Sequence, residues 1–250
     1  MKTATSLLAA CLLAACAARS DAQEMDTVRV GSPALRGARL PLGTVTVESF
    51  AIEGSVRKPT STTVRTITPG RDGADSVYVI RTLHWAPQAD TSVTVLAVRA
   101  DDLSLVYYRV KATRDSAAVT ASPGHLTGWV VMPDQPVSLL DRTLDWPVFA
   151  LGGQIPWLLP VLPLAQGYRA VVSRFSQWEG GEVLTPVEVQ GSETVTLGSR
   201  SFDCWRVDTG ALGPPGYRMI RWIDKASRRV VQSVLRGSSG GTEYWGYLRP

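Results

Sequence analysis

The stretch from Trp146 to Tyr168 contains no charged side chain, although Asp145 and Arg169 border it directly. At about 20 mostly apolar residues it is long enough to cross a bilayer as a helix. Its composition argues against that, because each interior proline costs a helix roughly 3 kcal/mol and lipid offers no partner for the carbonyl that it frees. The stretch contains four prolines, Pro147, Pro156, Pro160 and Pro163. We therefore predict short helices or loops here.

The second half of this stretch is rich in large apolar side chains. Six of them are Trp157, Leu158, Leu159, Val161, Leu162 and Leu164. Burying each is worth roughly 1.5–3 kcal/mol, so leaving all six in water would cost roughly 9–18 kcal/mol. That is as much as the whole stability of a typical domain, about 5–15 kcal/mol. We expect the protein's own core to cover them. Two alternatives remain open: a lid over an apolar cavity, or a surface that a partner covers. The predicted ligand or partner surface consists of Trp146, Phe149, Trp157, Leu158, Leu159, Leu162 and Leu164.

The N-terminus has the form of an export signal, with Lys2 followed by a run rich in Leu and Ala. The residues Leu13-Ala-Ala-Cys16 match the bacterial lipobox, which predicts cleavage before Cys16 and acylation of that cysteine. Acyl chains, at about 0.8 kcal/mol per buried methylene, would hold the protein on a membrane. We expect a lipoprotein on the periplasmic side of a bacterial outer membrane. Ordinary cleavage after Ala22 is the alternative, and it gives a soluble periplasmic or secreted protein.

Three parts of the chain follow from these signals. Residues 1–15 form the predicted signal peptide. Residues 16–40 lack hydrophobic periodicity and mix Ser, Gly, Ala, Pro and charges, which is typical of a flexible tether. Residues 41–250 are of a size for a single β-rich domain.

Alternating apolar residues separated by turn residues predict strands from Leu40 onward. In 44–52 the alternation shifts phase at Phe50, which indicates a bulge. The segment 137–146 is the best helix candidate, with Leu139, Leu140 and Leu144 on one face and a proline after it. Further strands are predicted at 62–68, 76–85, 92–99, 104–111, 117–121, 126–132, 169–178, 187–190, 193–197, 200–208, 217–223, 229–236 and 242–248.

An open sheet of ten or more strands normally curls. The predicted fold is therefore mainly β. We expect a curved antiparallel sheet that forms an open, incomplete barrel, with one or two short helices in the middle of the chain.

Four segments of the C-terminal half carry a resemblance: 187–195, 202–208, 221–231 with its Trp222-Ile-Asp224, and the closing 244–247. Together they resemble uncharacterised bacterial periplasmic β domains that look like the LolA and LolB lipoprotein-carrier superfamily. The resemblance covers 44–248 as architecture and 162–248 as motif. It implies a strongly curved, incomplete barrel whose concave side holds acyl chains or another apolar ligand. LolB is itself acylated and has a protruding apolar loop, and 155–165 is similar in kind.

The polar residues indicate no nucleic acid, metal, cofactor or catalytic site. The formal net charge is +4, and the basic residues are scattered singly instead of forming a block that would follow phosphates. His84 and His125 stand alone, without metal-ligand spacing. Cys204 is interpreted as a small buried residue. With no triad or phosphate loop, we do not expect an enzyme.

The expected function is a binding or carrier module in the cell envelope for an apolar or lipid-like ligand, attached to the membrane through its acyl anchor. Eight tryptophans suit a β core and equally a cavity for apolar chains. The alternative function is a structural or assembly component that docks on a partner protein through residues 155–165.

Overall fold

The computed structural model describes residues 25–35, 40–87, 89–113, 115–149, 155–176, 181–211, 217–237 and 242–249 of the 250-residue chain. The predicted signal peptide, the predicted anchor Cys16 and the alternative cleavage site at Ala22 lie outside these residues.

The described residues form a single sheet of 15 strands that is built from two meanders. The first meander consists of β2 (Gly43–Glu53), β3 (Val56–Asp72), β4 (Asp75–Ala86), β5 (Ala89–Arg99), β6 (Leu105–Lys111), β7 (Ser116–Ser122), β8 (His125–Val131) and β9 (Ser138–Thr143). The second consists of β10 (Arg169–Ser176), β11 (Gly181–Leu197), β12 (Arg200–Ala211), β13 (Tyr217–Asp224), β14 (Val230–Gly237) and β15 (Glu243–Leu248).

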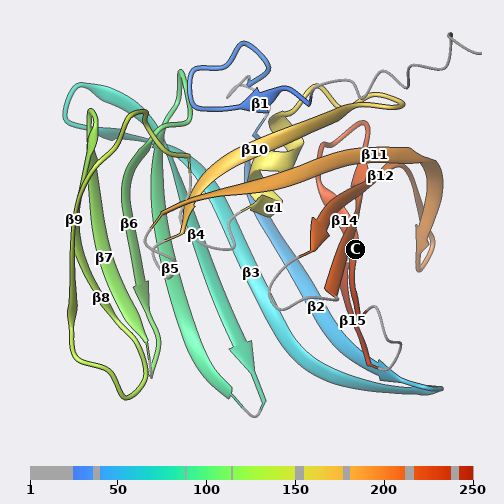
Figure 1. The fold of residues 1–250 in the computed structure, drawn as a ribbon. Coiled ribbons are helices and arrows are strands. Elements are labelled where there is room, and N and C mark those ends of the chain that lie inside the picture. The colour runs from blue at the N-terminus through green and yellow to red at the C-terminus, as the bar shows by residue number, and fades with distance from the viewer. Residues whose placement is uncertain are drawn as a thin grey trace, which may run out of the picture.

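The last strand joins the two meanders, because β15 pairs antiparallel with β2. A short strand, β1 (Thr27–Val28), pairs parallel with β10. The sheet order therefore runs from β1 at one edge to β9 at the other, and the sheet does not close into a barrel. Figure 1 shows the sheet bent around its interior, with β10 and β11 crossing over the first meander. The predicted fold class, a curved antiparallel sheet forming an open barrel, is confirmed.

The uncharged stretch connects the two meanders through the interior of this curve. It contains the helix α1 (Ile155–Leu158) and a single 3-10 turn, η2 (Leu159–Val161), and Figure 1 shows α1 inside the bend of the sheet. Trp157 and Leu159 are 1% and 0% exposed and belong to one core with Leu96 of the first meander and Val207 of the second. The protein's own core thus covers the large apolar side chains of this segment, as the sequence predicts: Trp157, Leu158, Leu159, Val161, Leu162 and Leu164.

The helix predicted at 137–146 is wrong, because these residues contain the edge strand β9. Leu140 lies opposite Gly128 of β8 and is 8% exposed, whereas the preceding Leu139 is 82% exposed. A helix would have placed both leucines on one face, but pairing with β8 imposes the two-residue period of a strand. The helix of the middle region lies further along the chain, and no helix among the described residues is long and apolar enough to cross a membrane.

Part of the predicted tether belongs to the folded body. Val28 and Leu35 are only 2% and 8% exposed, and both pack in the main core. The two-residue strand β1 is too short to show an alternation in the sequence, so its pairing with β10 was not visible as a pattern. The predicted bulge in β2 is confirmed by a register shift between Ser49 and Phe50.

Candidate functional site

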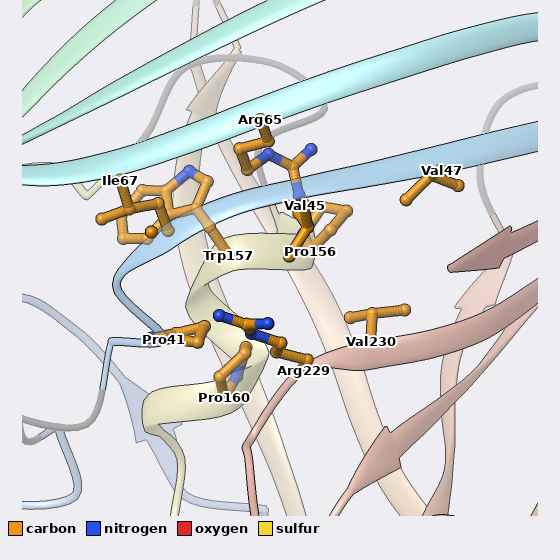
Figure 2. A pocket seen from close by; sticks show the side chains of 11 residues that line it. Pro41, Val45, Val47, Arg65, Ile67, Pro156, Trp157, Pro160, Arg229 and Val230 are labelled. Atoms are coloured by element: carbon orange, nitrogen blue, oxygen red, sulfur yellow. The ribbon is translucent and has the colours of Figure 1, made fainter. Parts of the chain in front are cut away.

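A small pocket lies on the concave side of the sheet, between α1–η2 and the strands β2, β3 and β14 (Figure 2). Its volume is about 40 Å³, which holds a few water molecules and no lipid chain. The described residues of α1–η2 therefore fill the interior at this point, and the pocket is the small space that they leave beside Trp157. The other lining residues are the apolar Pro41, Val45, Val47, Ile67, Pro156, Pro160 and Val230, the cationic Arg65 and Arg229, and Gly43.

Arg65 enters the pocket from β3. It lies opposite Val45 of β2 and Thr82 of β4, and directly opposite residues of an antiparallel pair share a face. Its Nε donates a long hydrogen bond of 3.5 Å to Thr82 Oγ1. Burial lowers the pKa of Arg65 to about 10, from an ordinary value of 12.5. Its charge is thus held in poorly solvated surroundings.

A second arginine faces the same interior from β13. Arg221 is 5% exposed, and its Nη1 donates a 2.7 Å hydrogen bond to Thr209 Oγ1. It lies opposite Ser233, which lies opposite Gly246. A Cβ added at Gly246 would stand 2.7 Å from Ser233 Oγ and 3.3 Å from a methyl of Val47, a residue of the pocket wall. The register therefore places Arg221 on the face that lines the pocket.

The two guanidinium groups of Arg65 and Arg221 lie close enough to repel each other. Burial lowers the pKa of Arg221 to about 10, and the charge of Arg65 is the second cause. Among the described residues, no carboxylate lies within 4 Å of either group. Arginines elsewhere on the sheet do have such partners: Arg99 pairs with Asp75, and Arg249 pairs with Glu48. The concave side thus holds these two like charges without a counterion among the described residues. Arg229, whose Nη2 donates to Leu42 O at 3.1 Å, adds a third cation at the pocket.

The indole of Trp157 is a further hydrogen-bond donor at the pocket. The indole Nε1 of Trp157 is buried and has no hydrogen-bond partner among the described residues. Figure 2 shows this side chain rising from α1 toward β3, the strand that carries Arg65. A buried N–H without an acceptor costs about 1–3 kcal/mol. The pocket therefore presents hydrogen-bond donors and positive charge.

Along the strands, the side chains on the concave face change from apolar to mostly polar at the position of Arg65. On one side, Ile67, Ile80 and Leu96 lie opposite one another in successive strands and belong to the main core. On the other side the inward positions of β3, β4 and β5 are polar, whereas Val47 of β2, opposite Thr63, is apolar. Thr63 Oγ1 lies 2.9 Å from His84 Nδ1. Burial lowers the pKa of His84. The polar inward positions beyond Arg65 are Ser49, Ser61, Thr63, His84 and Ser92.

The residues predicted as a ligand or partner surface differ in how deeply the structure buries them. Phe149, Leu158, Leu159, Leu162 and Leu164 are 0–6% exposed and belong to the main core. Trp157 belongs to that core and also lines the pocket.

Trp146 is the exception among these predicted residues. It is half-buried, and the guanidinium of Arg29 lies 4.3 Å from its ring centroid.

Sequence reasoning missed the arginines of the site. The scattered basic residues were used only to argue against a phosphate-binding block, but Arg65 has the same strand phase as the buried Ile67. That phase was the available signal.

The residues considered for metal binding or nucleophilic chemistry, among them His125 and Cys204, have the following surroundings in the structure. No group of three or more His, Cys, Asp or Glu that could hold a metal occurs in the part of the chain that the structure describes. His125 pairs through Nε2 with Asp141 at 2.9 Å. Cys204 is fully buried, and burial together with nearby carboxylates, Asp224 first among them, raises the pKa of its thiol to about 12. Such a thiol stays protonated and is a poor nucleophile.

No protein-family model matches the chain, and no curated protein matches it either. Its fold resembles that of a beta-barrel-like protein of the domain of unknown function DUF1849 from Brucella abortus. The two chains share 11% identity at a TM-score of 0.50, over 84% of this chain and 97% of the other. A DUF1329 family protein from Desulfovibrio piger matches 82% of each chain at 12% identity, but its TM-score of 0.24 supports no argument. The first likeness shows a barrel-like fold, and the resemblance to lipoprotein carriers stays a prediction.

Proposed function

We propose that this protein is an exported binding module of the cell envelope that holds an amphiphilic, lipid-like ligand on the concave side of its sheet. The observation that supports the proposal is the pocket beside Trp157, where apolar walls meet the unneutralised charge of Arg65. A ligand with an apolar chain and a polar end matches both parts. The barrel-like fold shared with a solved structure is consistent with a binding role.

A ligand chain longer than the pocket requires α1–η2 to move. The four-residue α1 has little stability of its own, and η2 has no side-chain cap. Both are held in place by packing in the core. An incoming apolar chain would bury similar area against the same strands, so the exchange of protein side chains for ligand is close to balanced in free energy.

The proposed location is the periplasmic face of a bacterial outer membrane, with Cys16 as the acylated N-terminus. The test is metabolic labelling with an alkyne-bearing palmitate, followed by membrane fractionation. The Cys16→Ala variant should lose both the label and the membrane association. An unlabelled wild-type protein would support cleavage after Ala22 and a soluble form.

Docking on a partner protein through 155–165 is the weaker function. It needs an accessible apolar surface, whereas Trp157, Leu158 and Leu162 are at most 1% exposed. A partner would meet these side chains only after they leave the core.

Native mass spectrometry of the purified protein tests the binding proposal, together with thermal unfolding in the presence of 1-dodecanol or dodecanoate. A co-purifying amphiphile or a higher melting temperature is expected. The Val45→Phe variant should weaken this effect because it fills the pocket. Val56→Phe is the matched control, since Val56 is 52% exposed and lies outside the pocket. A bare protein whose melting neither probe alters would refute the proposal.

A further inference from the structure

Arg65, Arg221 and the indole of Trp157 bring positive charge and hydrogen-bond donors to the concave side. We propose that the ligand ends in an oxyacid group, a carboxylate or a phosphate, which is held between Arg65 and Arg221. This group accepts a hydrogen bond from the indole N–H of Trp157. The inference rests on the proposed function. This anion subsite shares Trp157 with the apolar surface of the uncharged stretch and adds the two arginines, and it fixes the chemical class of the ligand's polar end.

Charge is the first argument. The half-buried Arg65 and the buried Arg221 repel each other, and no carboxylate lies within 4 Å of either among the described residues. A single anion between them would offset this repulsion. A neutral headgroup leaves the repulsion in place, and a cationic headgroup adds a further like charge. The site therefore selects for negative charge.

Hydrogen-bonding capacity is the second argument. A guanidinium donates through a planar fork that matches carboxylate and phosphate oxygens. Arg221 donates from Nη1 to Thr209 Oγ1, and the contact of Arg65 with Thr82 is at 3.5 Å, the long limit for a hydrogen bond. With respect to the described residues, both groups therefore keep further N–H donors for a ligand. The orphaned Nε1 of Trp157, in a side chain only 1% exposed, adds one more.

Position is the third argument. Arg65 stands where the concave face changes from the apolar Ile67 row to the polar Thr63 and His84 row. An amphiphile with its charged end at Arg65 therefore directs its chain toward Ile67 and Trp157, and away from the polar row. The direction of the ligand follows from this boundary.

Affinities of the purified protein for five probes test the subsite by titration calorimetry below micellar concentrations. The probes are dodecanoate, dodecyl phosphate, 1-dodecanol, dodecyltrimethylammonium and inorganic phosphate. We expect dodecanoate or dodecyl phosphate to bind about tenfold or more tightly than 1-dodecanol, because charge-assisted hydrogen bonds carry this preference. Dodecyltrimethylammonium should bind most weakly of the chain-bearing probes.

Variants locate the preference. Arg65→Met and Arg221→Met should each reduce affinity for the anionic probe about tenfold or more and leave 1-dodecanol nearly unchanged. Arg81→Met is the matched control, because Arg81 is exposed on β4, one position from Thr82 and on the opposite face. Arg65→Lys keeps the charge without the fork and should retain part of the preference. Circular dichroism of each variant confirms that it is folded.

The outcomes separate the subsite from the proposed function. Equal binding of dodecanoate and 1-dodecanol, or a preference that survives both arginine substitutions, overturns the subsite and leaves amphiphile binding intact. Binding of inorganic phosphate with no gain from a chain supports the subsite for a free oxyanion and refutes the proposed function. If none of the five probes binds, both fall.

Discussion

Replacing either Arg65, which is half-buried, or the buried Arg221 with methionine should stabilise the ligand-free protein. Methionine retains much of the apolar stem and removes the charge that the interior solvates poorly. The lowering of the pKa of Arg221 from 12.5 to about 10 corresponds to roughly 3 kcal/mol of unfavourable free energy for the charged form. Loss of the hydrogen bond to Thr209 offsets about 1 kcal/mol. The net expectation for Arg221→Met is about 1–2 kcal/mol of added stability.

The double variant should gain less than the two single variants together. The first substitution, at Arg65 or Arg221, removes one desolvated charge and the repulsion between the two groups. The second then removes only its own desolvation. At neutral pH both arginines are charged in the unfolded chain as well, so the whole effect is present at pH 7. This shortfall is the coupling that a double-mutant cycle measures.

Urea unfolding of the purified, ligand-free protein at pH 7, followed by tryptophan fluorescence and circular dichroism, provides the free energies. The control Arg81→Met, at an exposed position, should change stability by less than about 0.5 kcal/mol. The reasoning is refuted if Arg65→Met and Arg221→Met each destabilise the protein by more than about 1 kcal/mol. That result would mean that the two charges are already neutralised in the folded chain.

Three further predictions concern single positions. Gly128→Ala should destabilise the protein by more than about 3 kcal/mol in urea, because a Cβ there would lie 2.1 Å from the backbone oxygen of Ala118; a near-neutral result would refute the close packing of β7 on β8. Cys204, with a pKa raised to about 12, should resist iodoacetamide at pH 8 until urea unfolds the chain; rapid labelling of native protein would contradict its burial. Burial lowers the pKa of His84 from its ordinary 6.5. The unfolded state therefore binds the proton more readily, and the stability of the folded protein should fall as pH drops below 6.5. His84→Gln should flatten that fall, and an unchanged pH profile would refute the assignment of this pH dependence to His84.

Much of the fold could be predicted from local patterns. Alternating apolar residues marked most of the strands, and a phase shift marked the bulge at Phe50. The burial of Trp157 and its neighbours followed from the free energy of leaving them in water. Where local patterns compete, prediction failed. Leu139 and Leu140 fit a helix face, and only pairing with β8 shows that one points outward.

The candidate site depended on contacts between distant parts of the chain. Arg65 and Arg221 lie in different meanders, and the pairing of β15 with β2 brings their strands into one curved sheet. Strand alternation assigns each arginine to a face. It does not say which faces meet across the curve, because that depends on long-range register and on what fills the interior. The sequence by itself determined a curled β sheet with a sheltered apolar segment. Only the tertiary structure decided that the charges of Arg65 and Arg221 face the same interior.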